Sequence, residues 1–242
     1  MNYLNQFYPE SRFGGFSDRD GTIAFYNRVN ALLKKDSIIL NIGCGRGSFV
    51  EDEVKIRKNL QRFKGKVKKT IGIDIDPEAK VNPDIDCFWL IKKNRFPIRS
   101  NSIDLCIGDN VLEHVENPVL FFKECRRVLK KGGYLCLRTT NLFGYVGLAA
   151  KILPRKKHAA LLNQIQESRL EKDIFPKFYR ANSLYKIKSF LKQNNFDFSV
   201  YGISSEPAYF DFSKWLYWTA TILHHLTPNF FKVTIFVFAK NN

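Results

Sequence analysis

The chain has 242 residues, of which 45% are hydrophobic and 26% are charged. A chain of this length buries a core without disulfides or metal ions, so the composition indicates one continuous globular fold rather than a disulfide-stapled scaffold. The net charge of +16 is compatible with nucleic acid, a phosphorylated substrate or an anionic membrane surface. Scattered, solvated lysines account for the same charge without any partner.

Cysteine usage and the search for targeting segments point to a cytoplasmic protein without metal ligands. The five cysteines show no Cys-x-x-Cys spacing, so we expect them to be reduced and mostly buried. The adjacent His224 and His225 would point in different directions on a helix and make a poor metal pair. No signal peptide opens the chain. The apolar stretch 215–226 falls short of the ~20 residues that cross a bilayer.

The first half of the chain alternates helical and strand patterns. Residues 18–35 carry apolar side chains at helical spacing and predict a helix before the first strand. The strands that follow are expected at 38–42, 70–74, 86–91, 103–108 and 134–139, with helices at 49–62 and 117–130. This order predicts an α/β fold with a doubly wound, mostly parallel sheet.

The second half is less regular but closes on a strand pair. Residues 182–194 predict a helix, and 196–203 and 231–239 predict two final strands. We therefore expect a single domain over 1–242, with a cofactor-binding core at 36–141. Residues 142–181 and 205–230 are interpreted as helical and aromatic insertions on the substrate side.

The most informative segment is an apolar strand that runs into a glycine-rich turn, Gly43-Cys44-Gly45-Arg46-Gly47. Three glycines at alternate positions let the backbone turn sharply and approach a ligand closely. The dinucleotide pattern Gly-x-Gly-x-x-Gly would need a third glycine where Ser48 stands, and no phosphate-loop Gly-Lys-Ser/Thr follows. A glycine turn without any ligand is the alternative interpretation.

A second strand supports the ligand interpretation. Thr70-Ile71-Gly72-Ile73 is apolar and ends in Asp74. A carboxylate at the tip of the second strand can accept hydrogen bonds from both hydroxyls of a ribose. Asp74 is therefore the predicted ribose ligand.

From about residue 38 to 141 the chain resembles the type-11 domain of the class I S-adenosylmethionine-dependent methyltransferases. Five ordered motifs carry the resemblance: the glycine turn, Gly72-Ile73-Asp74, Phe96-Pro97 with Ser102-Ile103-Asp104, Asn110-Val111-Leu112-Glu113-His114-Val115, and Arg126-Arg127-Val128-Leu129-Lys130-Lys131-Gly132-Gly133. The flanks are similar to a bacterial subgroup of unsettled substrate, in Phe13-Gly14-Gly15-Phe16 with Asp20-Gly21-Thr22, in Arg138-Thr139-Thr140-Asn141, and in Phe175-Pro176 through Tyr179-Arg180.

The resemblance implies a Rossmann-like sheet of seven strands with the last strand antiparallel, and S-adenosylmethionine across the carboxyl ends of the first strands. The residues that it places at the cofactor are Asn41, Gly43, Cys44, Gly45, Gly47, Asp74, Ile75, Ile91, Lys92, Asp109 and Asn110. Two of them depart from the family pattern. Asn41 stands where an acid holds the ammonium end of the cofactor, and Lys92 stands where an acid contacts the adenine amino group.

For catalysis the resemblance points to the segment after the fourth strand. His114 is the predicted base, because an unperturbed pKa near ~6.5 suits proton removal from a hydroxyl. A histidine bonded to the backbone at a helix start is the alternative, and Glu113 can equally be structural. His158, Tyr179 and Arg180 fall in the insertion expected to cover the acceptor, where an arginine can hold a phosphate or carboxylate or form an ordinary surface pair.

The predicted function is methyl transfer to a small-molecule, glycan or lipid-linked acceptor, on oxygen. The alternatives are a noncatalytic binding protein that keeps the fold, and an RNA methyltransferase. The fourth strand ends in Gly108-Asp109-Asn110-Val111, which lacks the Pro-Pro-aromatic motif used on base amines and argues against nucleic acid. A Lys-rich surface and the aromatic stretch 215–226 keep open a peripheral contact with anionic lipid, with Trp215, Tyr217 and Trp218 as lid or packing residues.

Overall fold

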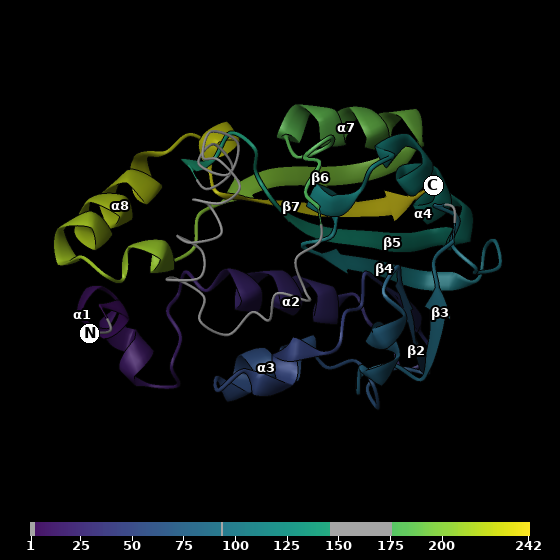
Figure 1. The fold of residues 1–242 in the computed structure, drawn as a ribbon, viewed down its shortest axis with the longest axis horizontal. Coiled ribbons are helices and arrows are strands. Elements are labelled where there is room, and N and C mark those ends of the chain that lie inside the picture. The colour runs from purple at the N-terminus through teal and green to yellow at the C-terminus, as the bar shows by residue number, and fades with distance from the viewer. Residues whose placement is uncertain (1–2, 93, 146–175) are drawn as a thin grey trace.

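The computed structural model describes residues 3–92, 94–145 and 176–242. Figure 1 shows a central sheet with helices on both of its faces and α8 at one end of the molecule. His158 and most of the expected insertion at 142–181 lie outside the described residues, so the prediction for that segment stays a prediction.

Seven strands form one sheet in the order β3-β2-β1-β4-β5-β7-β6. They are β1 (Ile38–Ile42), β2 (Lys69–Asp74), β3 (Cys87–Leu90), β4 (Ile103–Asp109), β5 (Leu129–Thr140), β6 (Phe196–Ile203) and β7 (Thr234–Asn241). Strands β1 to β5 are parallel to one another, and β7 is antiparallel to both β5 and β6. The predicted sheet, including its antiparallel last strand, is confirmed.

The helices in the described residues are α1 (Leu4–Phe7), α2 (Gly21–Ala31), α3 (Lys55–Gln61), α4 (Pro118–Val128), α7 (Leu184–Gln193) and α8 (Lys214–Leu226). Of these, α2, α4 and α7 bury apolar side chains in the two cores on either side of the sheet. Leu40 and Ile42 of β1 belong to the core under α4 and α7, whereas Ile39 packs in the core under α2. Burial on both faces explains why β1 is a continuous apolar run.

Two predicted elements differ in extent from the structure. The helix expected at 49–62 is a 3₁₀ turn at Ser48–Glu51 followed by α3. The Asp52 carboxylate accepts the Val54 amide at 3.0 Å and the Arg57 guanidinium, so it forms a local turn that delays the helix. The strand expected at 134–139 begins earlier, at Leu129.

The core around Phe236 provides a test of this packing. Its ring is fully buried, and its centroid lies 5.3 Å from that of Phe25 on α2. We expect Phe236→Ala to lower the free energy of unfolding by about 3–5 kcal/mol in urea denaturation. Tyr185→Ala, on an 83% exposed side chain of α7, is the control and should stay within about 0.5 kcal/mol. Equal stability of the two variants would contradict this packing.

Candidate functional site

The glycine turn adopts a conformation that only glycine accepts easily. Gly43, Gly45 and Gly47 have φ values of +61°, +54° and +85°, the left-handed region that side chains disfavour. A Cβ on Gly43 would lie 2.5 Å from a Val111 methyl group, whereas a Cβ on Gly45 would meet nothing within 4 Å. The outer side of Gly45 is therefore open to a ligand.

Hydrogen bonds from the second strand hold this turn in place. The Gly43 amide donates to the Ile73 carbonyl at 2.7 Å, and the Gly45 amide donates to Asp74 Oδ2 at 2.9 Å. The other oxygen of Asp74 accepts the Asp76 amide at 3.0 Å. A carboxylate oxygen has two acceptor sites, so each oxygen of Asp74 keeps one for a ligand. The structure thus places Asp74 in contact with the glycine turn, and its role as ribose ligand stays a prediction.

Asn82 holds the turn through its side chain, and no sequence motif pointed to this residue. Its Nδ2 donates to the carbonyl of Cys44 at 2.6 Å and to that of Gly45 at 3.2 Å, while its Oδ1 accepts the Asp84 amide. Burial, with a smaller contribution from Asp74, raises the pKa of the Cys44 thiol to about 12. Cys44 therefore stays neutral, and it offers a ligand only its backbone.

Two further residues predicted at the cofactor lie next to these elements. Ile75 follows Asp74 directly and is 58% exposed, as a side chain that packs on a flat ring would be. Asn41 is half-buried near the end of β1. Neither side chain is fully covered by the protein.

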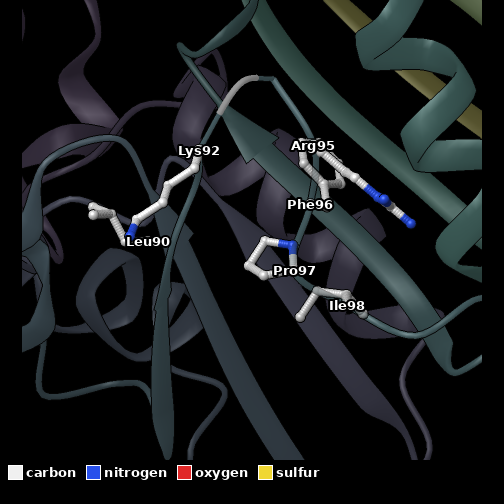
Figure 2. Close-up of a pocket in the computed structure, with 6 residues that line it drawn as sticks. All are labelled: Leu90, Lys92, Arg95, Phe96, Pro97 and Ile98. Carbon is white, nitrogen blue, oxygen red and sulfur yellow. The ribbon is translucent and has the colours of Figure 1, made fainter.

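A cavity of about 350 Å³ opens beyond the end of β3. Its lining residues are Leu90, Lys92, Arg95, Phe96, Pro97 and Ile98. Figure 2 shows the Lys92 side chain running toward Leu90 and the Arg95 side chain pointing to the opposite side. Ile91 donates its amide to the Asp74 carbonyl at 2.7 Å and packs its side chain against the core. Of these two predicted residues, only Lys92 lines the cavity.

At the end of β4, Asp109 is held by four donors. Arg138 donates to it from Nε at 2.6 Å and from Nη2. The Tyr26 hydroxyl donates at 3.0 Å, and the side-chain amide of Asn110 donates at 3.1 Å. Arg138 also donates to the Thr22 hydroxyl at 2.8 Å, which joins two of the flanking sequence motifs. Both carboxylate oxygens are thus fully used. Asp109 fixes the end of β4, and Asn110, at φ +52°, projects beyond it.

A second cavity, of about 300 Å³, lies beside Asn110. Its polar lining includes Asp20, Arg57, Asn110, Arg138, Glu206 and His224. Asp20 accepts the first amides of α2 and pairs with Arg57 at 3.1 Å. Burial raises the pKa of Glu206, whose carboxylate accepts the Ser17 hydroxyl. This cavity combines cations, carboxyls and an imidazole, which sequence reasoning did not bring together.

His224 lines this second cavity and has one ring nitrogen bonded to the main chain and one without a partner among the described residues. Its Nδ1 lies 2.9 Å from the Ser205 carbonyl, which can only accept, so Nδ1 carries the proton. Nε2 then has a lone pair, and among the described residues nothing donates to it. Burial lowers the pKa of His224, and its ring stacks on Tyr145 with centroids 5.6 Å apart. The imidazole is therefore held neutral.

The predicted base, His114, lies in the turn after β4 with the segment that begins at Pro176. Its Nδ1 is 3.0 Å from the Pro176 carbonyl, and Arg180 donates to the Glu116 carbonyl at 2.7 Å. The Tyr179 amide donates to the main-chain carbonyl of Glu113. The structure thus brings His114, Tyr179 and Arg180 together. Neither of the two cavities includes any of these residues. His158, the remaining predicted substrate residue, is outside the described chain.

Glu113 is a buried side chain in the same turn after β4, and its hydrogen bonds are structural. It is 3% exposed and accepts the Thr139 hydroxyl at 2.6 Å, and Asn182 donates to the same hydroxyl oxygen at 2.7 Å. Burial raises the pKa of its carboxyl group. This buried chain ties β4, β5 and the segment before α7 to one another.

The seven-stranded sheet, the glycine turn after β1 and the acid at the tip of β2 define a class I S-adenosylmethionine-dependent methyltransferase fold. The sequence profile described as a methyltransferase domain matches residues 40–137. Over these residues the chain is similar to that domain family.

Curated relatives agree with this assignment. An uncharacterized methyltransferase of Schizosaccharomyces pombe is 29% identical over 144 residues, which cover 55% of this chain and 49% of the relative. An uncharacterized protein of Methanocaldococcus jannaschii is 31% identical over 108 residues, covering 45% of this chain and 43% of the relative. The chain thus spans half or less of the length of the curated relatives it matches.

Solved structures share the fold at low sequence identity. A SAM-dependent methyltransferase of Thermotoga maritima has a TM-score of 0.53 at 15% identity, covering 99% of this chain and 97% of that one. The geranyl diphosphate C-methyltransferase of Streptomyces coelicolor, in complex with S-adenosyl-L-homocysteine, has a TM-score of 0.52 at 12% identity, covering 90% and 78%.

The ion pair at the end of β4 makes a stability prediction. Asp109 and Arg138 are 20% and 12% exposed, so Arg138→Met leaves a largely buried carboxylate without its main partner. We expect a loss of about 3 kcal/mol in the free energy of unfolding, measured by urea denaturation. The double variant Asp109→Asn with Arg138→Met removes the unpaired charge and should recover part of the loss. A double variant as unstable as the sum of both single variants would contradict the pairing.

Proposed function

We propose that the chain transfers a methyl group from S-adenosylmethionine to an oxygen atom of a small-molecule, glycan or lipid-linked acceptor. The observation that carries this proposal is the cavity beside Asn110, whose polar lining includes His224, an imidazole with a buried Nε2 that is unpartnered in the described part of the chain. A hydroxyl acceptor must lose its proton as it is methylated, and a neutral imidazole is suited to take it.

The open side of Gly45 and the unused acceptor sites of Asp74 fit the proposed cofactor. Asp74 would hold the ribose hydroxyls, Ile75 would pack on the adenine, and Asn41 would face the methionine end. When bound, S-adenosylmethionine supplies a methyl group on a positively charged sulfur, which activates it toward displacement. The remaining work of the protein is to align the acceptor and to keep water away from it.

The chain's own residues divide this work in the second cavity. Arg57 and Arg138 line it and are paired with Asp20 and Asp109, so the charge of each guanidinium is already balanced. His224 takes the acceptor proton at Nε2, while the Ser205 carbonyl holds Nδ1–H and fixes the tautomer. Asn110 lines this cavity at the end of β4, the strand next to the one that leads into the glycine turn, and it would orient the acceptor.

A noncatalytic binding protein is the second candidate, since Asn41 and Lys92 occupy two positions where the family has acids. Without those carboxylates, the neighbouring elements must supply the affinity for the cofactor. The contribution of Asp74 to cofactor binding then becomes decisive. An RNA acceptor has only the net charge of +16 in its favour.

Cofactor binding tests the role of Asp74. We expect the wild-type chain to bind S-adenosylmethionine in isothermal titration calorimetry, and Asp74→Ala to weaken binding by about 1.5–3 kcal/mol through the lost ribose hydrogen bonds. Asp18→Ala, whose side chain is 71% exposed, is the matched control and should bind like wild type. Wild-type affinity in Asp74→Ala would refute the assignment, and no binding by the wild-type chain would favour the noncatalytic candidate.

The choice of base is tested by the pH dependence of methyl transfer. The wild-type chain is first screened with radiolabelled S-adenosylmethionine against phenols, sugars and prenyl phosphates. With the acceptor found, His224→Asn should lower kcat by about 10²–10⁴. It should also remove the decline of kcat at low pH, because that decline follows protonation of His224 below its usual pKa. His114→Asn should change kcat far less. A larger loss of kcat in His114→Asn than in His224→Asn would instead identify His114 as the base that takes the acceptor proton.

A further inference from the structure

The helix α8 presents apolar side chains to solvent along its whole length. Six of them are exposed: Trp215, Leu216, Trp218, Ile222, Leu223 and Leu226. Trp215 and Leu226, near the two ends, are 76% and 73% exposed. We call this set the outer face of α8. Contiguous apolar patches of this kind mark interaction sites on proteins.

The opposite face of the same helix is already used inside the protein. Tyr217 is 1% exposed and stacks on Phe7 of α1 with ring centroids 5.3 Å apart, Ala220 is buried, and His224 lines the second cavity. The core therefore accounts for one side of α8 only. A helix that is apolar all round is either buried or in contact with lipid.

Polar atoms on the outer face are satisfied within the helix. The Thr219 hydroxyl donates to the main-chain carbonyls of Trp215 at 2.9 Å and Leu216 at 3.1 Å. It therefore needs no water when the face is covered. The two tryptophans suit the boundary between headgroups and acyl chains, where an apolar ring with one N–H donor is favoured.

The charge around this face selects an anionic partner. No Asp or Glu follows Asp211 in the chain, and the net charge is +16. Lys214 is exposed at the start of α8, and Arg19 contacts His225 at 3.2 Å near its end. Basic side chains beside an apolar helix face attract anionic lipid headgroups.

We propose that the outer face of α8 binds the surface of an anionic lipid bilayer, with the helix lying in the plane of the interface. Its 13 residues span roughly 20 Å at 1.5 Å per residue, less than the ~30 Å hydrocarbon core. No helix within the described residues is long and apolar enough to cross a membrane. The helix rests on the bilayer through one face.

This placement selects an acceptor class, a step that rests on the proposed methyl transfer. Because the inner face of α8 lines part of the second cavity, bilayer contact on the outer face holds that cavity one helix diameter, roughly 10 Å, from the membrane surface. The head group of a lipid-linked acceptor then has only this distance to cross to reach the cavity. Among the acceptors proposed above, the lipid-linked class fits this geometry.

Tryptophan fluorescence can report on this face selectively. The chain has three tryptophans, and Trp89 lies on β3, at the edge of the sheet away from α8. In Trp89→Phe the emission comes from Trp215 and Trp218 alone. With vesicles of phosphatidylcholine and phosphatidylglycerol we expect emission at shorter wavelength and co-sedimentation with lipid. Pure phosphatidylcholine vesicles should bind at least about tenfold more weakly, since a few basic side chains each contribute about 1 kcal/mol.

The decisive variant is Trp215→Ser with Trp218→Ser, compared with Tyr185→Ser on the exposed surface of α7. The first should lose about tenfold or more in vesicle binding, as expected for aromatic side chains removed from water, and the control should not. Undiminished binding, or dimers in size-exclusion chromatography that the double variant abolishes, would overturn the proposal. Calorimetry with S-adenosylmethionine in vesicle-free buffer tests the methyltransferase function separately, because the variants leave the cofactor residues unchanged.

Discussion

The bond from the Gly45 amide to the Asp74 carboxylate is the contact on which the site depends. It joins the turn after β1 to the tip of β2, two parallel neighbours whose carboxyl ends meet at one edge of the sheet. Asn82 reinforces the same turn through the carbonyls of Cys44 and Gly45. A carboxylate that shapes the backbone and still has free acceptor sites can hold a ribose in a fixed place.

Elements with a strong local pattern could be predicted from the sequence. The strand 196–203 matches β6, and the acid at the tip of β2 lies where the alternation placed it. The prediction of one helix over 49–62 was wrong because the Asp52 side chain accepts a hydrogen bond from the Val54 amide and so competes with helical hydrogen bonding. Periodicity describes which face is buried, and it cannot register a single competing hydrogen bond.

The catalytic side of the site could not be predicted because its residues come from distant parts of the chain. Asp109 carries a family motif, yet its acceptors are occupied by Tyr26 and by Arg138, which is 29 positions away. His114 fits a motif, and its Nδ1 turns to the Pro176 carbonyl. His224 belongs to no motif in the sequence, and only the tertiary contact with Ser205 shows which of its nitrogens is free.

The helix α8 contributes both to the second cavity and to the exposed apolar surface of the protein. Its buried stripe holds His224 at the second cavity, and its outer face leaves two tryptophans in solvent. Exposed tryptophans on a monomer carry an unfavourable hydration free energy that a partner surface removes. Because both faces belong to one rigid helix, whatever covers the tryptophans also fixes the orientation of the cavity. A bilayer on the outer face would therefore hold the second cavity at about one helix diameter from the headgroups.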